Sequence, residues 1–559
     1  MFRNISGNQI FTIVYALIHI AFFIFGFLKQ KNDKDLSNIN TIGLSVYISR
    51  GAGLVLGFDS SVLLLPVCRT LIRTLRSWKV LNNRWIRIPF NESLLFHKQT
   101  ARYILLFTII HVNAHYINFF TLEENSKKIA ALSDASTSTT ASTSSKITII
   151  EALHLHYRSW AGLTGHIMLL IMFLLYTTSK KEIRIAHFET FYITHHLSFL
   201  FYGALLVHGV GCFVVTNTGH CKGYQVWHFS MFGCIMYVIE RLLRWIQSQS
   251  KTNLTKIIFH PGNTMELRFQ IYKELRLKSD PTKSIQELRR DYKPGQYVFI
   301  QIPEISKIQW HPFTLTSSPN ENFWSVHIRV AGDWTKELAT RFQCIKTDIK
   351  KDADDKISTN NNIYQDELIQ TKIYVNGPFG APAEDALNYK TLVLIGAGIG
   401  VTPFASILKY LLYEYQHNSS KLKPTKIFFF WVNRDQQAFE WFQNLLSILE
   451  ESMPNGFLYI HIYMTGKMDL PSIQNIMMND PSTELDPLTD LKSKTYYGRP
   501  DFIKIFQQIK SELIRTNHEY FNEVGVFFCG PKPLAQVLKK VSKSESDGKC
   551  KFHFYKENF

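Results

Sequence analysis

The chain has 559 residues, which at roughly 100 to 200 residues per domain allows three or four folding units and excludes one small domain. Hydrophobic residues make up 46% and charged residues only 19%, below the roughly 25% of an ordinary soluble chain, so wholesale disorder is excluded. The formal net charge of +17 is compatible with nucleic acid, an anionic membrane surface or phosphorylated substrates. The cysteines include no CxxC pair, which argues against a zinc ribbon or a disulfide scaffold.

Apolar residues crowd the first 250 positions, whereas mixed sequence fills the remainder. Six segments in this first part are long and apolar enough to span a bilayer of roughly 30 Å, the second and the sixth being the weakest. They lie at 11–28, 42–67, 101–120, 160–177, 191–215 and 226–246. The first segment runs on into Lys29 and Lys31 without a small-residue cleavage site, so we expect it to stay in the protein.

Basic residues mark the loops that we expect on the cytoplasmic side. They are concentrated at 69–98, 180–184 and 241–251, after the second, fourth and sixth segments. The loop after the third segment holds a Ser/Thr-rich run at 133–145, which we expect to be a flexible external tether. Cys212 and Cys221 lie close together between two apolar segments and could pair outside the cell.

Short alternating strands begin after about residue 252, for example MELRFQIY, YVFIQI and FWSVHIRV, and Pro and Gly interrupt them. This pattern is typical of an antiparallel barrel. From Thr391 onward strands alternate with helices, which predicts a parallel nucleotide-binding sheet. The sequence therefore predicts an all-α six-helix transmembrane domain over 1–250, an antiparallel β-barrel over 251–385 and an α/β domain over 386–559.

Four histidines within two predicted spans are candidate haem ligands. His97 and His111 are 14 residues apart, about 21 Å of helical rise and about 40° short of whole turns, so they share a face at two depths. His195 and His208 are 13 residues apart, about 19.5 Å of rise, so two neighbouring helices could hold two stacked haems. On an ideal helix, however, these two point about 140° apart. Either that helix bends or His196 replaces His195, and any of these histidines could instead be an ordinary hydrogen-bonding residue of a helix bundle.

Two further polar residues lie near the outer end of these spans. His115 is one helical turn beyond His111, and Arg50 begins the second span on the same outer side. Both could simply be interfacial. Alternatively, they line a polar pocket beside the outer haem, where an oxygen molecule or a haem propionate meets positive charge and a proton donor.

The barrel contains a candidate flavin site. HPFTLTSSP, from His311 to Pro319, ends a strand with hydroxyl groups and backbone amides that could hold an isoalloxazine ring and ribityl chain. A downstream strand, SVHIRV, is followed by GDWT, which places Arg329 and the 332–335 turn where a flavin pyrophosphate could be neutralised. The alternative is an ordinary barrel strand with a surface arginine.

A glycine-rich loop marks the predicted dinucleotide site. GAGIGVTPF, from Gly396 to Phe404, follows the strand TLVLI and opens a helix, which is the context that a phosphate-binding loop needs. The glycines let the backbone approach phosphate, Thr402 can donate a hydrogen bond, and Pro403 suits the first helical turn.

Two arginines and a cysteine-containing turn extend this site. Arg434 follows the next strand, where an acidic residue would hold an NAD ribose, so a basic residue there suits the extra phosphate of NADP. Arg499 is a candidate second phosphate clamp, although either arginine could be a solvated surface charge. FFCGPKPLA turns at Gly530 and Pro531 after Cys529, at the crevice edge where nicotinamide would lie.

Together these residues resemble the NADPH oxidases over nearly the whole chain. The matching strings are LLLPVCR, FHK, THHL, HPFTLTSSP, HIR, GDWT, NGPFG, GAGIGVTPFASIL, AFEWF, YGRP, FCGP and KENF. The resemblance implies an electron path from cytosolic NADPH through FAD and two b-type haems to molecular oxygen across the membrane, with superoxide as the product. It also implies a multi-pass protein of the plasma, endosomal or phagosomal membrane, with FAD and NADPH domains in the cytosol.

The resemblance implies haem ligands residue by residue. His97 and His195 would hold the inner haem, and His111 and His208 the outer one, which favours His195 over His196.

It also implies roles outside the ligand set. Arg50 and His115 would lie at the oxygen site, and Phe559 would stack on the flavin until nicotinamide displaces it. The residues expected to contact FAD are His311, Pro312, Phe313, Thr314, Arg329, Trp334 and Thr335. Those expected to contact NADPH are Gly396, Gly398, Gly400, Thr402, Pro403, Arg434, Arg499, Cys529, Gly530 and Pro531.

The implied partners are membrane lipid, a small membrane light chain, and cytosolic activating proteins that include a Rho-family GTPase. Nucleic acid is not needed to account for the positive charge. The sequence has no EF-hand loop and no peroxidase-like region, which disfavours the calcium-regulated and dual-oxidase branches. Two rival functions stay open: a ferric-chelate reductase that uses the same electron path, and a haem-containing proton channel or scaffold.

Overall fold

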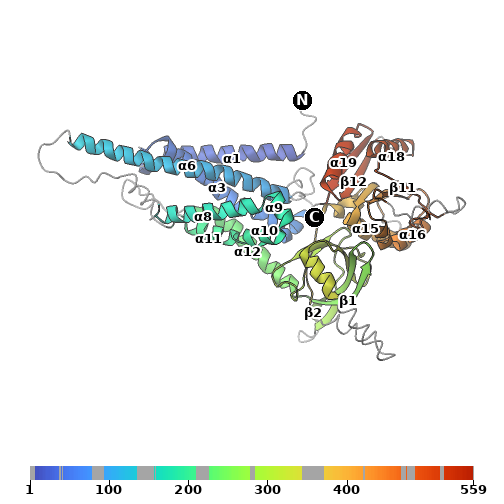
Figure 1. Cartoon of the computed structure of the whole chain (residues 1–559). Coiled ribbons are helices and arrows are strands. Elements are labelled where there is room, and N and C mark those ends of the chain that lie inside the picture. The colour runs from blue at the N-terminus through green and yellow to red at the C-terminus, as the bar shows by residue number, and fades with distance from the viewer. Residues whose placement is uncertain are drawn as a thin grey trace. The chain divides into compact units, whose positions relative to one another are not determined.

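The chain divides into two compact units, Met1–Leu242 and Leu243–Phe559, in a computed structural model (Figure 1). The predicted boundary at residue 385 falls inside the second unit. The structure describes residues 7–36, 40, 42–77, 93–134, 157, 159–208, 210, 226–276, 284–342, 371–418, 422–467, 474, 485–516 and 521–557.

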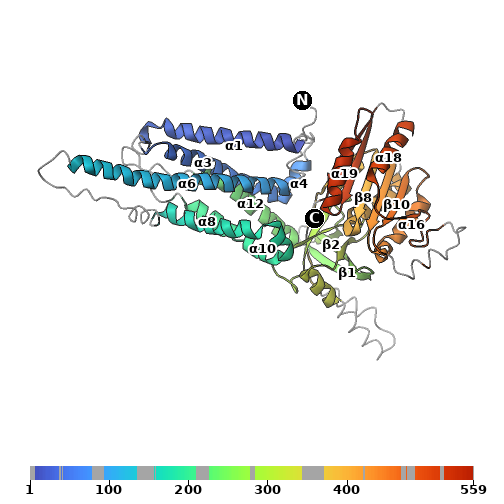
Figure 2. The same cartoon turned by 45° about the horizontal axis from the view of Figure 1, so that its top comes forward.

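The first unit is built from helices, and α1, α3 and α6 lie side by side within it (Figure 2). Its elements are α1 (Gly7–Lys31), η2 (Lys34–Leu36), α3 (Leu44–Val62), η3 (Leu65–Val67), α4 (Arg69–Ser77), α6 (Ser93–Asp134), α8 (Trp160–Thr178), α9 (Lys181–Ala186), α10 (Phe188–His195), α11 (Ser198–Val207) and α12 (Val226–Ser248). Five described segments are long and apolar enough to cross a membrane: Gln9–Lys31, Leu44–Val67, Ser93–Thr121, Trp160–Thr178 and Phe188–Val207. They coincide with the first five predicted spans.

The sixth predicted span forms the helix α12, but this helix is not among those five. Glu240, Arg241 and Arg244 lie in its C-terminal half and lower its mean hydropathy. Glu240 is only 3% exposed, and its carboxylate accepts hydrogen bonds from the backbone N–H of Thr70 at 2.9 and 3.0 Å. It therefore caps the first turn of α4, where a negative charge is stabilising.

The fifth predicted span is interrupted. His196 and Leu197 form a turn between α10 and α11. Around this turn the Leu197 N–H donates to Thr194 and the Phe199 N–H to the carbonyl of His196, both at 3.0 Å, which is the tighter 3₁₀ pattern. The span therefore does not continue as one ideal helix through this turn, which favours the alternative in which it bends.

A buried polar network joins α1, α3 and α6. His19 Nε2 lies 2.9 and 3.0 Å from the two carboxylate oxygens of Asp59, and the Tyr15 hydroxyl donates to the same carboxylate at 2.9 Å. That hydroxyl also lies 3.0 Å from Oγ1 of Thr100. None of the four side chains is more than 4% exposed, so these groups are satisfied by one another rather than by water.

The second unit begins with two antiparallel sheets around one hydrophobic core. One sheet contains β1 (Lys251–His260), β2 (Thr264–Arg276), β3 (Ser284–Leu288) and β6 (Trp324–Arg329), with β2 paired to the other three strands. The other contains β4 (Tyr297–Gln301), β5 (His311–Thr314) and β7 (Tyr374–Phe379). A bridge between Leu315 and Val326 links the two sheets, and a helix over 333–342 lies beside them. This arrangement confirms the predicted antiparallel fold.

A six-stranded parallel sheet follows, in the order β11-β10-β9-β8-β12-β13. The strands are β8 (Thr391–Ala397), β9 (Lys426–Asn433), β10 (Leu458–Met464), β11 (Thr495–Tyr497), β12 (Asn522–Cys529) and β13 (Cys550–Lys556). The helices α15 (Thr402–Asn418) and α16 (Gln443–Ser452) pack on one face, and α18 (Phe502–Thr516) and α19 (Lys532–Ser544) on the other. The short elements are η5 (Pro382–Asn388), η6 (Gly398–Val401) and η8 (Gln436–Trp441).

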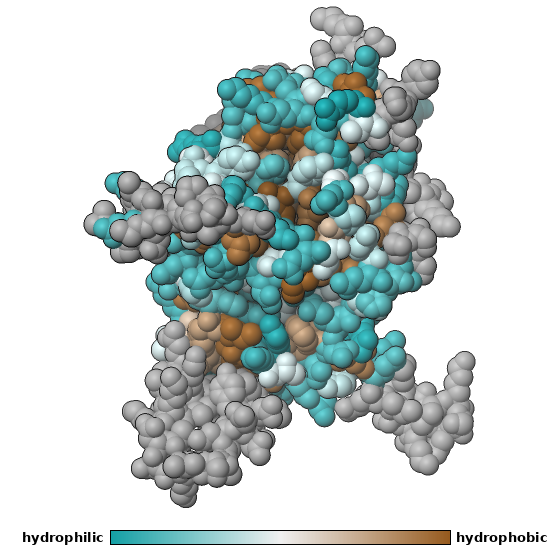
Figure 3. All heavy atoms as spheres, turned by 90° about the vertical axis from the view of Figure 1, so that its right-hand side faces the viewer, coloured by the Kyte–Doolittle hydropathy of each residue, from teal (hydrophilic) through white to brown (hydrophobic). Residues whose placement is uncertain are grey.

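The polarity of the exposed side chains differs between the helices of the first unit and the face drawn in Figure 3. The helices of the first unit expose large apolar side chains, for example Leu17 on α1 at 58% and Phe173 on α8 at 65%, as lipid-facing positions do. Over the face drawn in Figure 3 hydrophilic side chains predominate, and hydrophobic ones form scattered patches.

We predict that Asp59→Ala destabilises the helical unit by roughly 3–5 kcal/mol, because His19 and Tyr15 then keep buried donors without an acceptor. A lowered melting temperature of the purified protein in detergent would show this. The control is Glu182→Ala, which removes an exposed carboxylate from α9. Equal melting temperatures for the two variants would contradict the prediction.

Candidate functional site

Two histidines face each other in the helical unit. His97 on α6 and His195 at the end of α10 have ring centres 6.3 Å apart, with ring planes at 67°. Imidazole is a common ligand of haem iron, and this separation leaves room for an iron between the two rings. His196 is exposed instead, and its Nδ1 donates to the Tyr192 carbonyl of its own helix at 2.7 Å.

The other two candidate ligands each lie against a glycine. A Cβ added at Gly53 would lie 3.4 Å from Cε1 of His111, and one added at Gly165 would lie 3.4 Å from Cε1 of His208. These are tight contacts, so larger residues at either glycine would displace the imidazole. The absence of a side chain there leaves each ring room for the orientation that it adopts.

Hydrogen bonds hold three of the four imidazoles through Nδ1. His97 donates to the Leu63 carbonyl at 2.9 Å, and His111 to the Ser49 carbonyl at 2.9 Å. His208 Nδ1 lies 2.9 Å from the hydroxyl oxygen of Thr164. Metal-binding histidines are usually anchored in this way, which fixes the tautomer and leaves Nε2 for the metal. The anchored imidazoles of His97, His111 and His208 therefore have the chemistry that haem ligands need.

Arg50 and His115 are both placed beside His111. The rings of His111 and His115 are 4.5 Å apart and nearly perpendicular, at 77°. Arg50 directly follows Ser49, whose carbonyl accepts the His111 hydrogen bond. The structure thus brings the two predicted oxygen-site residues to one of the outer candidate ligands.

The predicted flavin residues come together in the barrel. The ring of Trp334 is stacked on His311 at 4.2 Å and lies 6.0 Å from Phe313. Trp334 is 5% exposed, and its Nε1 is a buried donor with no hydrogen-bond partner among the described residues. Such a donor suits an acceptor on a bound group.

The remaining flavin candidates lie on β5, at the end of β6 and in the helix over 333–342. Thr314 is buried, Pro312 is exposed, and Arg329 is exposed at the end of β6. The predicted 332–335 turn is instead the start of the helix over 333–342. The Thr335 hydroxyl accepts from the N–H groups of Ala331 and Gly332 at 3.0 Å and thereby caps this helix.

The glycine-rich loop follows β8 and packs against the end of β12. Gly398 has φ +58°, which favours glycine, and a Cβ at Gly396 would lie 2.9 Å from Cα of Val401. A Cβ at Gly400 would overlap the backbone carbonyl of Cys529. Thr402 and Pro403 are buried in the first turn of α15, as predicted for the start of this helix. Because β8 and β12 carry connections to opposite sides of the sheet, this is its topological switch point.

The other dinucleotide candidates lie at the same edge of the sheet. Arg434 directly follows β9 and Arg499 follows β11, and both are exposed. Since all six strands are parallel, their C-terminal ends share the edge that carries the glycine-rich loop. Two positive charges and a set of backbone amides therefore lie at the same edge of the sheet.

Cys529 ends β12 and is followed by Gly530 and Pro531, which begin the turn into α19. A Cβ at Gly530 would lie 2.7 Å from the Cβ of Ala397, so only glycine fits there. Burial raises the pKa of the Cys529 thiol, which is therefore a neutral thiol at physiological pH. Phe559 lies outside the described residues, as do Cys212 and Cys221.

Three family models match the chain: "Ferric reductase like transmembrane component" at 56–206, "FAD-binding domain" at 250–383 and "Ferric reductase NAD binding domain" at 389–543. The chain is 34% identical to a superoxide-generating NADPH oxidase heavy chain of Dictyostelium discoideum, over 99% of this chain and 97% of that protein. It is also 34% identical to NADPH oxidase 1 of Mus musculus, over 99% and 94% of the two chains. The third relative is NADPH oxidase 3 of Homo sapiens, 32% identical over 100% and 99%.

The chain belongs to the NADPH oxidase family. Membership confirms the predicted family and the order of transmembrane, FAD-binding and NAD-binding domains. The roles of individual residues in this NADPH oxidase stay predictions, supported by the geometry described above.

Sequence reasoning missed two clusters in this NADPH oxidase. One is the Asp59 network, for which a lone carboxylate in an apolar span was an available signal. The other joins His260, Glu266 and His327, whose possible ligand atoms lie within 4.8 Å of one another. Glu266 and His327 are directly paired across β2 and β6, a register that the sequence alone does not give.

We predict that Cys529 of the folded protein reacts with a maleimide at least ~100-fold more slowly than in the unfolded chain, because its thiol is buried and neutral. Peptide mass spectrometry after timed labelling at neutral pH measures both rates. Labelling of Cys529 at the same rate in both states would contradict the buried placement.

Proposed function

We propose that this NADPH oxidase moves electrons from cytosolic NADPH through FAD and two b-type haems to molecular oxygen on the other side of the membrane, where superoxide forms. The observation that carries the proposal is the separation of 6.3 Å between the rings of His97 and His195, which suits one haem iron between them. The family models and the relatives named above support the same path.

The four histidines would hold the two haems. His97 and His195 would hold the inner haem, and His111 and His208 the outer one. When bound, FAD supplies the conversion of a two-electron hydride into single electrons, and the haems supply one-electron carriers. The protein contributes ligation and spacing, since the 14 residues from His97 to His111 give about 21 Å of rise along α6.

The flavin and nucleotide residues would orient the two cytosolic groups. The rings of His311 and Phe313 lie beside that of Trp334, and the Nε1–H of Trp334 is a buried donor. Arg329 offers a positive charge for the flavin pyrophosphate. The amides of the glycine-rich loop and the charge of Arg434 would hold the NADPH phosphates.

Arg50 and His115 would bind molecular oxygen beside the proposed outer haem. His115 contacts His111, and Arg50 follows Ser49, whose carbonyl accepts from His111, which supports a role for both beside the proposed outer haem. Positive charge favours an anionic product at the moment when it forms.

The orientation follows from the basic residues of the first unit. Arg69, Arg73 and Arg76 lie in or begin α4, and Lys181 and Arg184 lie in α9, at the loops predicted to face the cytosol. The FAD and NADPH domains would lie on that side, in a plasma, endosomal or phagosomal membrane. A membrane light chain and cytosolic activators, including a Rho-family GTPase, stay predictions from the resemblance.

The proposal is tested with the full-length protein in lipid nanodiscs. Addition of NADPH in air should give superoxide, measured as cytochrome c reduction that superoxide dismutase inhibits. His195→Gln should lose haem and product, whereas the neighbouring His196→Gln should retain both, because only His195 faces His97. Reduction of a ferric chelate without oxygen, combined with no superoxide in air, would instead identify a ferric-chelate reductase. Full haem content in His195→Gln would overturn the ligand assignment.

We predict that Arg434→Ala raises the KM for NADPH about 10- to 100-fold, because one charge-assisted hydrogen bond contributes roughly 1.5–3 kcal/mol. The KM for NADH should change much less, since NADH lacks the 2′-phosphate. The control is Arg515→Ala in the last turn of α18. An equal change for both nucleotides would show that Arg434 does not contact this phosphate.

A further inference from the structure

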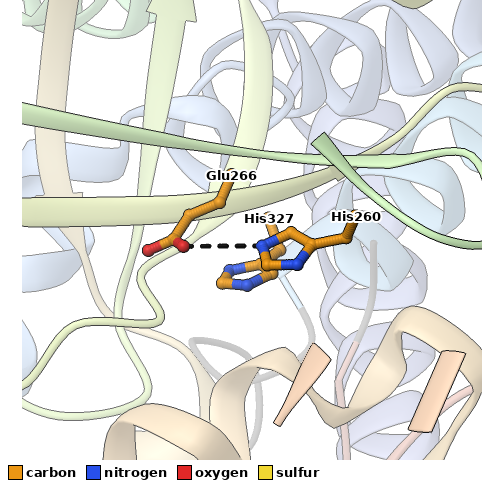
Figure 4. A group of neighbouring side chains, drawn as sticks. All are labelled: His260, Glu266 and His327. Carbon is orange, nitrogen blue, oxygen red and sulfur yellow. Dashed lines mark ion pairs between the residues drawn. The ribbon is translucent and has the colours of Figure 1, made fainter. Parts of the chain in front are cut away.

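Three side chains of metal-binding type meet at one end of the barrel. His260 ends β1, Glu266 lies on β2 and His327 on β6, and Figure 4 shows the two imidazoles one above the other beside the carboxylate. One ligand atom from each lies within 4.8 Å of the others. The cluster shares no residue with the four histidines of the helical unit or with the residues expected to contact FAD and NADPH, although His327 and Arg329 lie on the same strand.

The separation of His260 from Glu266 suits a shared metal better than it suits a hydrogen bond. His260 Nε2 lies 3.5 Å from Glu266 Oε2, beyond the roughly 2.7–3.2 Å of an N–H···O bond. Two ligands of a tetrahedral ion with bonds of about 2.0 Å lie about 3.3 Å apart. His260 Nε2 is buried and has no hydrogen-bond partner among the described residues, so the atom aimed at the carboxylate lacks the contact that burial normally requires.

Neighbouring groups hold the other two side chains. Nδ1 of His327 lies 2.9 Å from the hydroxyl oxygen of Thr316, which leaves Nε2 for a metal. Arg268 donates to both carboxylate oxygens of Glu266, from Nε to Oε1 at 2.7 Å and from Nη2 to Oε2 at 3.1 Å. The shorter bond can hold Oε1 while Oε2, which accepts the longer one through a single lone pair, also binds an ion. Glu266 and His327 are 4% and 6% exposed, so both would be shielded from competing water.

We propose that His260, Glu266 and His327 bind one divalent transition-metal ion, with Zn²⁺ as the best fit to two imidazoles and one carboxylate. Water would complete the tetrahedron. Mg²⁺ and Ca²⁺ prefer all-oxygen ligand sets and are disfavoured by the two imidazoles.

An ion at this site would affect how the β1–β2 hairpin packs against residues 435–442. The ring of His327 lies 4.7 Å from that of Phe442, and Trp441 Nε1 donates to the Pro261 carbonyl at 2.7 Å. A Cβ at Gly262 would lie 2.7 Å from Oδ2 of Asp435. The β1–β2 hairpin that supplies His260 therefore packs against residues 435–442, which follow Arg434. An ion that ties this hairpin to β6 should stabilise the second unit.

The test uses the full-length protein with its cofactors and without a histidine tag. The protein is incubated with excess Zn²⁺ and passed through gel filtration, and retained zinc is measured by mass spectrometry against protein from amino-acid analysis. Wild type should retain one zinc per chain. His260→Gln and Glu266→Gln should lose it, and His417→Gln should keep it, since His417 is exposed and bonded to its own helix.

Zinc-edge X-ray absorption supplies a second measurement on the wild-type protein. It should show only nitrogen and oxygen ligands at about 2.0 Å, with imidazole scattering and no sulfur at about 2.3 Å. His260→Gln removes no hydrogen bond of Nε2, and unchanged flavin content confirms that the variant is folded. Wild type that retains no zinc, zinc unchanged in His260→Gln, or sulfur ligands would each overturn the site. None of these readouts depends on NADPH oxidation, so failure here leaves the proposed function intact.

Discussion

Two of the candidate haem ligands, His97 and His111 on α6, are held by hydrogen bonds to backbone carbonyls of α3 and of its C-cap. His97 donates to the carbonyl of Leu63 and His111 to that of Ser49, each at 2.9 Å. Leu63 is the C-cap of α3, so its carbonyl has no partner within the helix, and His97 supplies one. In a region without water such a bond satisfies one ring nitrogen, and it decides which nitrogen the imidazole presents to a metal. Without these contacts neither ring would keep a fixed direction.

Close approach of the helices makes these bonds possible. A Cβ at Gly51 would lie 2.8 Å from the Phe23 carbonyl of α1, and one at Gly53 would crowd His111. Small residues at such interfaces let helices pack closely when lipid offers no hydrophobic driving force. α3 therefore serves two neighbours at once: it lies against α1 on one side and carries the acceptors for α6 on the other.

The sequence was informative where the signal is local. Hydropathy located the first five spans, and the strand–glycine–helix pattern located the loop from Gly396 to Gly400, because each depends on neighbouring residues. The spacing of His195 and His208 showed that an ideal helix was insufficient, but it could not choose between a bend and His196. The choice depends on the turn at His196 and Leu197 and on the position of His97, which are tertiary features.

The parts that the sequence did not predict depend on register between distant strands or helices. Glu266 and His327 are 61 positions apart and become neighbours only through the pairing of β2 with β6. Gly400 similarly meets Cys529 because β8 and β12 are adjacent in the sheet. A shift of two residues in either pairing would keep every hydrophobic side chain on its own face and yet separate these groups. Hydrophobic patterning thus specifies the layers but not the chemistry between them.

The Asp59 network bears on the rival hypothesis of a proton channel. Carboxylate and histidine side chains within a membrane often mark a proton path, and this pair lies in the helical unit. However, the Asp59 carboxylate accepts from the Tyr15 hydroxyl and lies 2.9 Å from His19 Nε2, and His19 Nδ1 donates to the Tyr15 carbonyl at 2.6 Å. With exposures of 0% for Asp59 and 1% for His19, the pair offers no surface to water at either side. A proton relay needs groups that exchange partners, whereas these are held by one another and join α1 to α3. The network therefore acts as a fixed contact between helices, and the candidate chemistry of the membrane unit lies with the four histidines.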